Sequence, residues 1–230
     1  MLELHKLSFD SNSTDNKTKH IMAVGSILGG RGEFNATVWG SGIRSFSSVR
    51  NLAIRKFYKK LDIRAVRGPL TREALLSCGY KCPEVYGDPD VLMPMIYSPN
   101  TESKRGTVLI THYSTEQKAF HKMENITLLD IKTKDYKKFI DSIASAEKVI
   151  SSSLNGIIIA ETYGIPAVFL RNGIESETLK FYDWYFSTER YNVKVANTLE
   201  QALALLPMEL PDLQDMRTNL VESFPYDLWE

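Results

Sequence analysis

The fold of this chain is decided by the stretch Ser151-Ser152-Ser153-Leu154-Asn155-Gly156-Ile157-Ile158-Ile159-Ala160-Glu161-Thr162-Tyr163-Gly164-Ile165-Pro166. An apolar run at residues 147–150 leads into the serines, and the helix that they open closes at Gly164 before a second apolar run at 167–170. A strand, a tight polar turn, a helix and a second strand are typical of a parallel α/β unit. The stretch therefore predicts an α/β fold.

The polar turn of this stretch is also a candidate binding site. It places backbone N–H groups and short hydroxyls at the positive end of a helix, which binds anions well. Ser152, Ser153, Asn155 and Gly156 are therefore candidate ligands of a phosphate or carboxylate group. The other interpretation is a tight strand–helix connection in which the serines only cap the helix. The stretch alone leaves both interpretations open.

Composition limits the classes of protein to consider. The 230 residues are 43% hydrophobic and 24% charged, enough for a sizeable core without disulfides or metal. Lys and Arg balance Asp and Glu at 28 each, so no net charge attracts nucleic acid or an anionic membrane. No apolar run is long enough for a membrane span and the start lacks the pattern of a secretion signal, so we expect a cytoplasmic protein. Cys78 and Cys82 have no second ligand pair and are expected to be free thiols, with no metal site.

The first part of the chain predicts an incomplete Rossmann-like domain over residues 21–100. Residues 1–20 are polar and are expected to form a flexible lead-in. Apolar runs at 21–24 and 37–39 end at Gly25 and Gly40, as strands do where a ligand needs room. We expect a third strand at 63–66, a helix over 70–78, and a loop with a short strand over 83–94.

The second part predicts a Rossmann-like domain over residues 107–210, after an interdomain linker at 98–106. Strands alternate with helices there, which favours a parallel sheet covered on both faces. Besides the opening stretch, the expected elements are strands at 107–111, 126–131 and 193–195 and helices at 136–146, 181–185 and 199–206. A C-terminal helix at 213–224 lies in a separate segment, 211–230.

Two residues follow predicted strands at the edge where ligands of an open α/β sheet lie. Arg67 precedes a helix that starts at Pro69, and its guanidinium could bind a carboxylate or phosphate with two hydrogen bonds. The alternative is an ordinary surface arginine. His112 directly follows the strand at 107–111, which favours a catalytic role as much as a structural one. We expect Arg67 and the serine turn to face each other across a cleft.

Three further residues are candidates with competing interpretations. Asp88 lies in a Gly-Asp-Pro turn, where aspartate usually caps its own backbone. Glu161 lies in an apolar helix, so its carboxylate needs either a protein partner or a ligand hydroxyl. Lys180 could supply a second cation to an anionic ligand, although solvated lysines are more common.

The order and spacing of several short motifs resemble the polysaccharide pyruvyl transferase family, in particular its exopolysaccharide branch, from about residue 21 to the C-terminus. Each motif is weak alone, but the set is fairly specific. The motifs are Gly25-Ser26-Ile27-Leu28, Val38-Trp39-Gly40-Ser41-Gly42-Ile43, Val66-Arg67-Gly68-Pro69-Leu70-Thr71, Gly87-Asp88-Pro89, Thr111-His112-Tyr113, Ser151-Ser152-Ser153-Leu154-Asn155-Gly156, Lys180-Phe181-Tyr182-Asp183-Trp184-Tyr185 and Phe224-Pro225-Tyr226-Asp227-Leu228-Trp229.

The resemblance implies two Rossmann-like domains similar to the GT-B glycosyltransferases, and a transferase that moves the enolpyruvyl unit of phosphoenolpyruvate onto a sugar as a pyruvate ketal. The acceptor would be an exopolysaccharide, a capsule glycan or a lipid-linked precursor. Phosphoenolpyruvate would be the co-substrate, with no other cofactor. The enzyme would associate peripherally with membrane-bound glycan assembly, with homo-oligomers possible. The implied site residues are His112, Asn155 and Glu161 for catalysis, Arg67, Ser152, Ser153, Asn155, Gly156 and Lys180 for the donor, and Gly25, Ser26, Gly40 and Asp88 on the acceptor side.

The chain departs from the family pattern in two places. Asn155 stands where the family has histidine, and an asparagine cannot deliver a proton, so the acid role would pass to His112 or activity would fall. The family's first strand and its Asn-Phe-Gly-Asp-like turn are missing. The first domain therefore looks truncated, with an exposed sheet edge that a partner chain could cover.

Two other functions remain open from the sequence. One is a GT-B-type glycosyltransferase that uses a nucleotide sugar, because Glu161 followed by Gly164-Ile165-Pro166 is similar to the donor region of those enzymes. The other is a non-catalytic relative that lost the motif histidine at Asn155. In that case Asn155→His should restore turnover.

Overall fold

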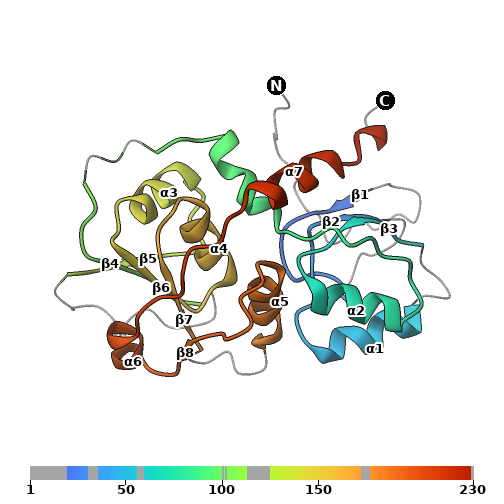
Figure 1. Ribbon diagram of the computed structural model, residues 1–230, viewed down its shortest axis with the longest axis horizontal. Helices are drawn as coiled ribbons and strands as arrows, with labels where there is room; N and C mark the ends of the chain where they lie inside the picture. Colours follow the sequence, from blue (N-terminus) through green and yellow to red (C-terminus); the bar gives the residue numbers. More distant parts are fainter. Residues whose placement is uncertain are drawn as a thin grey trace.

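The computed structural model describes residues 20–30, 36–55, 60–99, 101, 103–112, 125–171 and 177–228. These residues form two parallel sheets that lie side by side, confirming the predicted α/β class (Figure 1). The smaller sheet has the order β1-β2-β3, and the larger has the order β5-β4-β6-β7-β8. The strands are β1 (His20–Met22), β2 (Ala36–Trp39), β3 (Asp62–Ala65), β4 (Thr107–Ile110), β5 (Ile126–Leu129), β6 (Lys148–Ser151), β7 (Ala167–Leu170) and β8 (Val195–Ala196).

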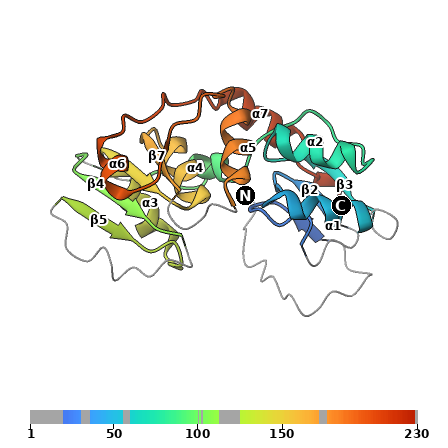
Figure 2. The ribbon, with the colours of Figure 1, turned by 90° about the horizontal axis from the view of Figure 1, so that it is seen from below.

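Helices cover both sheets, and one of them lies between the two halves (Figures 1 and 2). They are α1 (Phe46–Arg55), α2 (Pro69–Ser77), α3 (Tyr136–Ala144), α4 (Leu154–Thr162), α5 (Leu179–Ser187), α6 (Leu199–Ala204) and α7 (Gln214–Glu222), with 3₁₀ helices η1 (Pro89–Met95) and η4 (Tyr226–Leu228). The central helix is α5, and it packs on α2 of the first half. Helix α1 and η1 were not predicted. The segment expected to be a loop over 83–94 makes one bridge, Val66 to Tyr86, and then turns into η1.

Helix α4 forms the centre of the larger core. Its residues from Gly156 to Thr162 are all buried, because the apolar run that starts at Ile157 faces the sheet on one side and η1 on the other. Gly156 lets the helix approach the strands closely: a Cβ there would lie 2.6 Å from the Ser151 Oγ and 3.0 Å from the Ile110 Cδ1. Close packing therefore explains this glycine.

The C-terminal segment returns to the first half, where α7 covers the smaller sheet (Figure 1). Trp39 of β2 donates its indole N–H to the Leu220 carbonyl at 2.9 Å, and its ring meets Phe224 edge-on at 4.9 Å. Arg217 donates to the carbonyls of Val91 and Thr162. The described part of this segment, residues 211–228, therefore ties the two halves together.

None of the helices in the described parts of the chain has the length and apolarity needed to span a lipid bilayer.

Candidate functional site

Helix α4 begins without a side-chain cap. The Ser151 hydroxyl closes the turn itself: it accepts from the Ser153 N–H at 2.9 Å and donates to the Ser153 carbonyl at 2.8 Å. The N-cap residue Ser153 makes no capping bond through its side chain, and the first turn carries no acidic residue. Ser152 and Ser153 are buried at this positive helix end. The arrangement is compatible with an anion site, one of the two interpretations that the sequence leaves open.

The end of β4 lies next to this helix start. Ile110 pairs with Ser151 in the sheet, so Thr111 and His112 leave β4 where Ser152 and Ser153 leave β6. The Thr111 hydroxyl is buried and has no hydrogen-bond partner among the described residues. The sheet therefore brings two of the predicted elements, His112 and the serine turn, to the same edge.

His112 belongs to a cluster of charged groups just before α5. Its Nε2 lies 3.5 Å from the Glu177 carboxylate, which accepts a 2.6 Å hydrogen bond from the Lys180 ammonium. Both His112, 6% exposed, and Lys180, 8% exposed, are largely withdrawn from solvent. Tyr113, which the resemblance placed beside His112, lies outside the described residues.

The electrostatic environment favours neutral His112. Burial lowers its pKa below the ordinary 6.5, and the positive charges of Lys180 and Arg44 lower it further, although Glu177 acts in the opposite direction. A neutral imidazole has one unprotonated nitrogen that can take up a proton, and it has already lost the acidic proton of the imidazolium form. In this environment His112 is thus better suited to act as a base than as the acid that the sequence suggested.

Asn155 contacts a carboxylate that sequence reasoning missed. Its Nδ2 donates to the Asp90 Oδ2 at 2.7 Å, which links the first turn of α4 to η1. Burial raises the pKa of Asp90 to about 6, although the hydrogen bond from Asn155 opposes the rise. A carboxyl group that can hold a proton near neutral pH therefore lies beside the position where the family pattern has histidine. The second aspartate in Gly87-Asp88-Pro89-Asp90 was the available signal.

Asp88 and Gly40, both predicted on the acceptor side, lie within the packing of η1. Asp88 is fully buried and accepts the Asp90 N–H at 3.2 Å as the N-cap of η1. Burial and the neighbouring Asp90 raise the pKa of Asp88 well above its usual range. Gly40 has a φ of 95°, and a Cβ there would collide with the Pro89 ring. These contacts give both residues structural roles.

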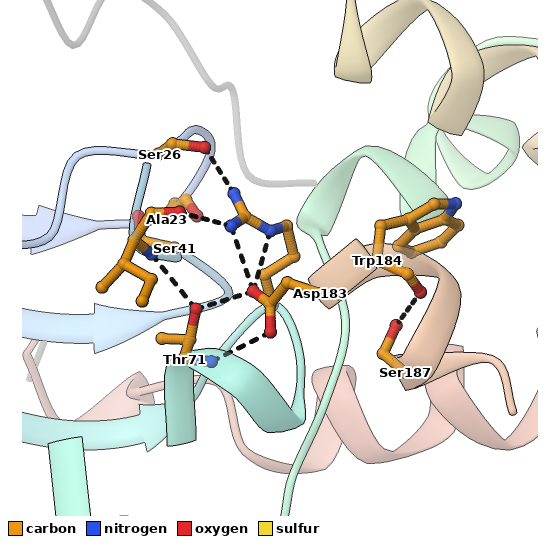
Figure 3. A network of polar contacts seen from close by, with 9 residues as sticks. Ala23, Ser26, Ser41, Thr71, Asp183, Trp184 and Ser187 are labelled. Carbon is orange, nitrogen blue, oxygen red and sulfur yellow. Dashed lines mark hydrogen bonds and ion pairs between the residues drawn. The ribbon is translucent and has the colours of Figure 1, made fainter. Parts of the chain in front are cut away.

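Arg67 follows β3 and binds Asp183 of α5, which Figure 3 shows together with Ser26 and Thr71. Its guanidinium is 0% exposed and bonds to the Asp183 carboxylate, with Nε at 3.1 Å and Nη2 at 3.0 Å. The remaining donors reach the Ser26 hydroxyl at 2.6 Å and the Ile43 carbonyl at 2.7 Å. Thr71 donates its hydroxyl to the same carboxylate at 2.6 Å. In this structure Arg67 joins the two halves, and the partners of its guanidinium are Asp183, Ser26 and Ile43 rather than a group in the serine turn that it was expected to face.

Glu161 has a protein partner. Both of its oxygens accept from Arg190, at 2.7 and 2.8 Å, and Oε2 also accepts the Trp184 indole N–H at 2.8 Å. The carboxylate is 5% exposed. Of the two expectations from the sequence, a protein partner or a ligand hydroxyl, the structure shows the protein partner.

Ser26 and Gly25 lie in the turn after β1. Gly25 has a φ of 103°, which allows the turn, and Ser26 lines a cavity of about 370 Å³ together with Arg44. This cavity lies in the first half. In the part of the chain that the structure describes, no group of three or more His, Cys, Asp or Glu side chains could hold a metal ion, and Cys78 and Cys82 are free thiols.

Comparison with known proteins gives two matches. A family model described as polysaccharide pyruvyl transferase matches residues 19–173, which include Arg67, Asp90, His112 and the serine turn. A protein of Acanthamoeba polyphaga mimivirus, described as uncharacterized, is 28% identical over 201 residues. That alignment covers 81% of this chain and 67% of the viral protein.

Proposed function

Because the chain belongs to the polysaccharide pyruvyl transferase family, we propose that it transfers the pyruvyl group of phosphoenolpyruvate to a sugar, as a ketal. The acceptor would be a surface polysaccharide or its lipid-linked precursor. The observation that carries the proposal is the uncapped start of α4 beside the buried cluster of His112, Glu177 and Lys180. Phosphoenolpyruvate carries a phosphate and a carboxylate, and this edge of the sheet offers an anion site and a buried cation.

The donor would bind with its phosphate at the start of α4. The backbone N–H groups of the first turn and the hydroxyls of Ser152 and Ser153 can donate to phosphate oxygens. Lys180 would neutralise a second anionic oxygen, because burial strengthens its charge interactions. Burial also lowers the pKa of Lys180, while the Glu177 partner opposes that change.

Asp90, whose pKa is raised, supplies the acid, and His112, whose pKa is lowered, supplies the base. Asp90 protonates the methylene carbon of phosphoenolpyruvate, which leaves an oxocarbenium-like centre at C2. A sugar hydroxyl attacks C2 and gives its proton to His112, whose positive form Glu177 stabilises. The C2–O bond to phosphate then breaks, and inorganic phosphate leaves with the proton that His112 took up. A second sugar hydroxyl attacks C2 to close the ketal and gives its proton to the Asp90 carboxylate, which restores the acid.

Glu161 weighs against the nucleotide-sugar alternative. That function requires its carboxylate for a donor hydroxyl, whereas Arg190 and Trp184 already bond to both oxygens. A ligand would have to break a buried ion pair, which is costly.

Ligand-induced stabilisation tests the donor. We expect phosphoenolpyruvate to raise the melting temperature, since a ligand at a hundred times its Kd stabilises the native state by about 2.7 kcal/mol. Nucleotide sugars at the same concentration should give no shift. A shift with a nucleotide sugar and none with phosphoenolpyruvate would end the pyruvyl assignment.

Lys180→Met should weaken phosphoenolpyruvate binding about tenfold or more, because a charged hydrogen bond is worth about 1.5–3 kcal/mol. The methionine keeps the length and packing of the side chain. The matched control is Lys194→Met: among the described residues, Lys194 reaches the Leu206 carbonyl alone, at 3.5 Å. Calorimetric titration of both variants measures the difference, and equal affinities would remove Lys180 from the donor site.

The pH dependence of kcat/KM should be bell-shaped with a weakly acidic optimum. On the acid side the rate should rise with pH through a pKa below 6.5, because His112 must lose its proton to act as base. On the alkaline side the rate should fall through the Asp90 pKa of about 6, because Asp90 must keep its proton to act as acid. Initial rates of phosphate release across weakly acidic to neutral pH measure the profile. A rate that keeps rising to neutral pH is incompatible with these roles.

A further inference from the structure

The outer face of α1 carries large apolar side chains at positions where a surface helix normally carries polar ones. Phe46 is 80% exposed and Ile54 is 57% exposed, and the exposed Arg50 lies between them. These three positions are four residues apart, so their side chains follow one another along the helix for about 12 Å. We call this stripe of Phe46, Arg50 and Ile54 the α1 outer face.

Packing of the fold does not explain the two apolar side chains of this face. The inner face of α1 already supplies Val49 and Leu52 to the core of the first half. Phe46 and Ile54 belong to none of the hydrophobic clusters formed by the described residues. In Figure 1, α1 lies at the outer edge of the first half, beside α2. Both side chains therefore expose apolar area that an apolar phase could take up.

The segment around α1 is strongly basic, although the charges of the whole chain balance. Residues 34–61 contain no aspartate or glutamate. The basic residues of this segment are Arg44, Arg50, Arg55, Lys56, Lys59 and Lys60. Arg44 and Arg50 are exposed, and within the described segments neither forms an ion pair. Exposed apolar groups among basic ones, with no acidic residue, are complementary in charge to an anionic lipid surface.

A lipid bilayer fits this face better than another protein does. A specific protein interface buries about 800 Å² on each partner around a packed apolar centre, and a stripe one residue wide is too narrow for that. At a bilayer, Phe46 and Ile54 can enter the boundary between headgroups and acyl chains. The long side chain of Arg50 can then extend back to the lipid phosphates.

We propose that the α1 outer face docks the protein on an anionic lipid bilayer, with Phe46 and Ile54 inserted and Arg44 and Arg50 on the lipid phosphates. The inference goes beyond the proposed function, because docking requires no part of the reaction. The occupant is the bilayer surface itself, whichever sugar the donor site serves.

The docking face begins close to the donor site. Burial lowers the pKa of His112 and of Lys180, and the positive charge of Arg44 lowers both further. Arg44, two residues before Phe46, therefore lies within electrostatic reach of the cluster at the start of α5. A protein docked through α1 would hold its donor site near the lipid surface.

Co-sedimentation of the full chain with lipid vesicles tests the occupant. The probes are vesicles of phosphatidylcholine alone and vesicles that also contain phosphatidylglycerol. We expect binding to the anionic vesicles and none to the neutral ones. Binding should fall about tenfold between about 0.15 M and 1 M salt, because the Debye length shrinks from about 8 Å to about 3 Å. Equal binding to the two kinds of vesicle, or binding to neither, overturns the proposal.

Two variants and two controls locate the binding. Phe46→Gln should weaken it about tenfold or more, because burying a phenylalanine side chain away from water is worth at least that factor. Arg50→Gln should weaken it about fivefold, the usual contribution of one basic residue at an anionic surface. The controls, Leu206→Gln and Lys134→Gln, change an exposed leucine and an exposed lysine of the other half and should leave the affinity unchanged. Unchanged affinity in both α1 variants overturns the proposal, as do equal losses in the controls.

A second copy of the chain is the competing occupant. Sedimentation velocity without lipid should give the same oligomeric state for the parent chain and for Phe46→Gln. A dimer of the parent chain that Phe46→Gln dissociates would assign the α1 outer face to self-association and overturn the proposal.

The same variants separate this inference from the proposed function. Phe46→Gln should keep the thermal shift with phosphoenolpyruvate, because Phe46 lies outside the donor site. If phosphoenolpyruvate gives no shift but vesicle binding depends on Phe46 and Arg50, the pyruvyl assignment fails and the docking face stands. If phosphoenolpyruvate binds and reacts while anionic vesicles leave the protein in solution, the assignment stands and the docking face fails.

Discussion

Asp90→Asn should lower phosphate release from phosphoenolpyruvate by about 10²–10⁴-fold, the usual contribution of a positioned acid. The amide keeps the size of the side chain and can still contact Asn155, but it holds no transferable proton. The variant should bind phosphoenolpyruvate as well as the parent protein, because the anion site at α4 does not include Asp90. Initial rates and a thermal shift on the same sample measure both quantities.

The matched control is Asp130→Asn. Asp130 is an exposed aspartate whose carboxylate, within the described segments, accepts the backbone N–H of Lys132 and no other donor. Its rate should equal that of the parent. Full activity in Asp90→Asn would show that another group protonates the donor. Asn155→His tests the alternative that the chain is a non-catalytic relative. A large gain in rate would mean that the chain lost its acid with the motif histidine.

Asp183→Ala should destabilise the protein by about 3–5 kcal/mol, because it leaves the Arg67 guanidinium buried without a counter-charge. The change also removes the acceptor of the Thr71 hydroxyl and backbone N–H. Urea unfolding followed by circular dichroism measures the loss. The double variant Arg67→Met, Asp183→Leu should recover much of it, since a buried pair can often be replaced by apolar groups.

The control for this prediction is Asp227→Ala. Asp227 pairs with Arg64 at 3.1 Å, but both side chains are partly exposed, so the loss should be about 0–1 kcal/mol. Equal losses in the two single variants would contradict the interpretation of Arg67 as the link between the halves. An Arg67→Ala variant that folds should still bind phosphoenolpyruvate, because the proposed donor site does not include Arg67.

Local patterns predicted most of the second half of the fold. The run from 147 to 170 contains a strand, a polar turn, a helix and a second strand in full, and β6, α4 and β7 follow it closely. Helix α1 was missed because Phe46, 80% exposed, and Ile54, 57% exposed, interrupt the apolar periodicity. Packing of the buried Leu52 holds that helix in place, and such tertiary contacts leave little trace in sequence.

The sequence predicted some residues of the candidate site but not their interaction partners. Strand ends identified His112 and the serine turn, because parallel strands bring their carboxyl ends to one edge. The same rule pointed to Arg67, which follows a strand of the other sheet and binds Asp183 instead. The hydrogen-bond partners of these residues could not be predicted, because Asp183 lies 116 positions from Arg67 and Asp90 lies 65 positions from Asn155. Those partners decide whether a charged group holds the fold together or is available to a ligand.

The most direct test is a reaction of the full chain with phosphoenolpyruvate in D₂O. The acceptors would be glycans containing galactose, glucose or N-acetylmannosamine, in free and diphosphate-linked forms. We expect one phosphate released for each pyruvyl group gained by the glycan, and one deuterium in the methyl group of the ketal, because the acid protonates C3 from exchangeable sites. Ketal formation without deuterium, or glycan extension from a nucleotide sugar with no phosphoenolpyruvate consumed, would contradict the account.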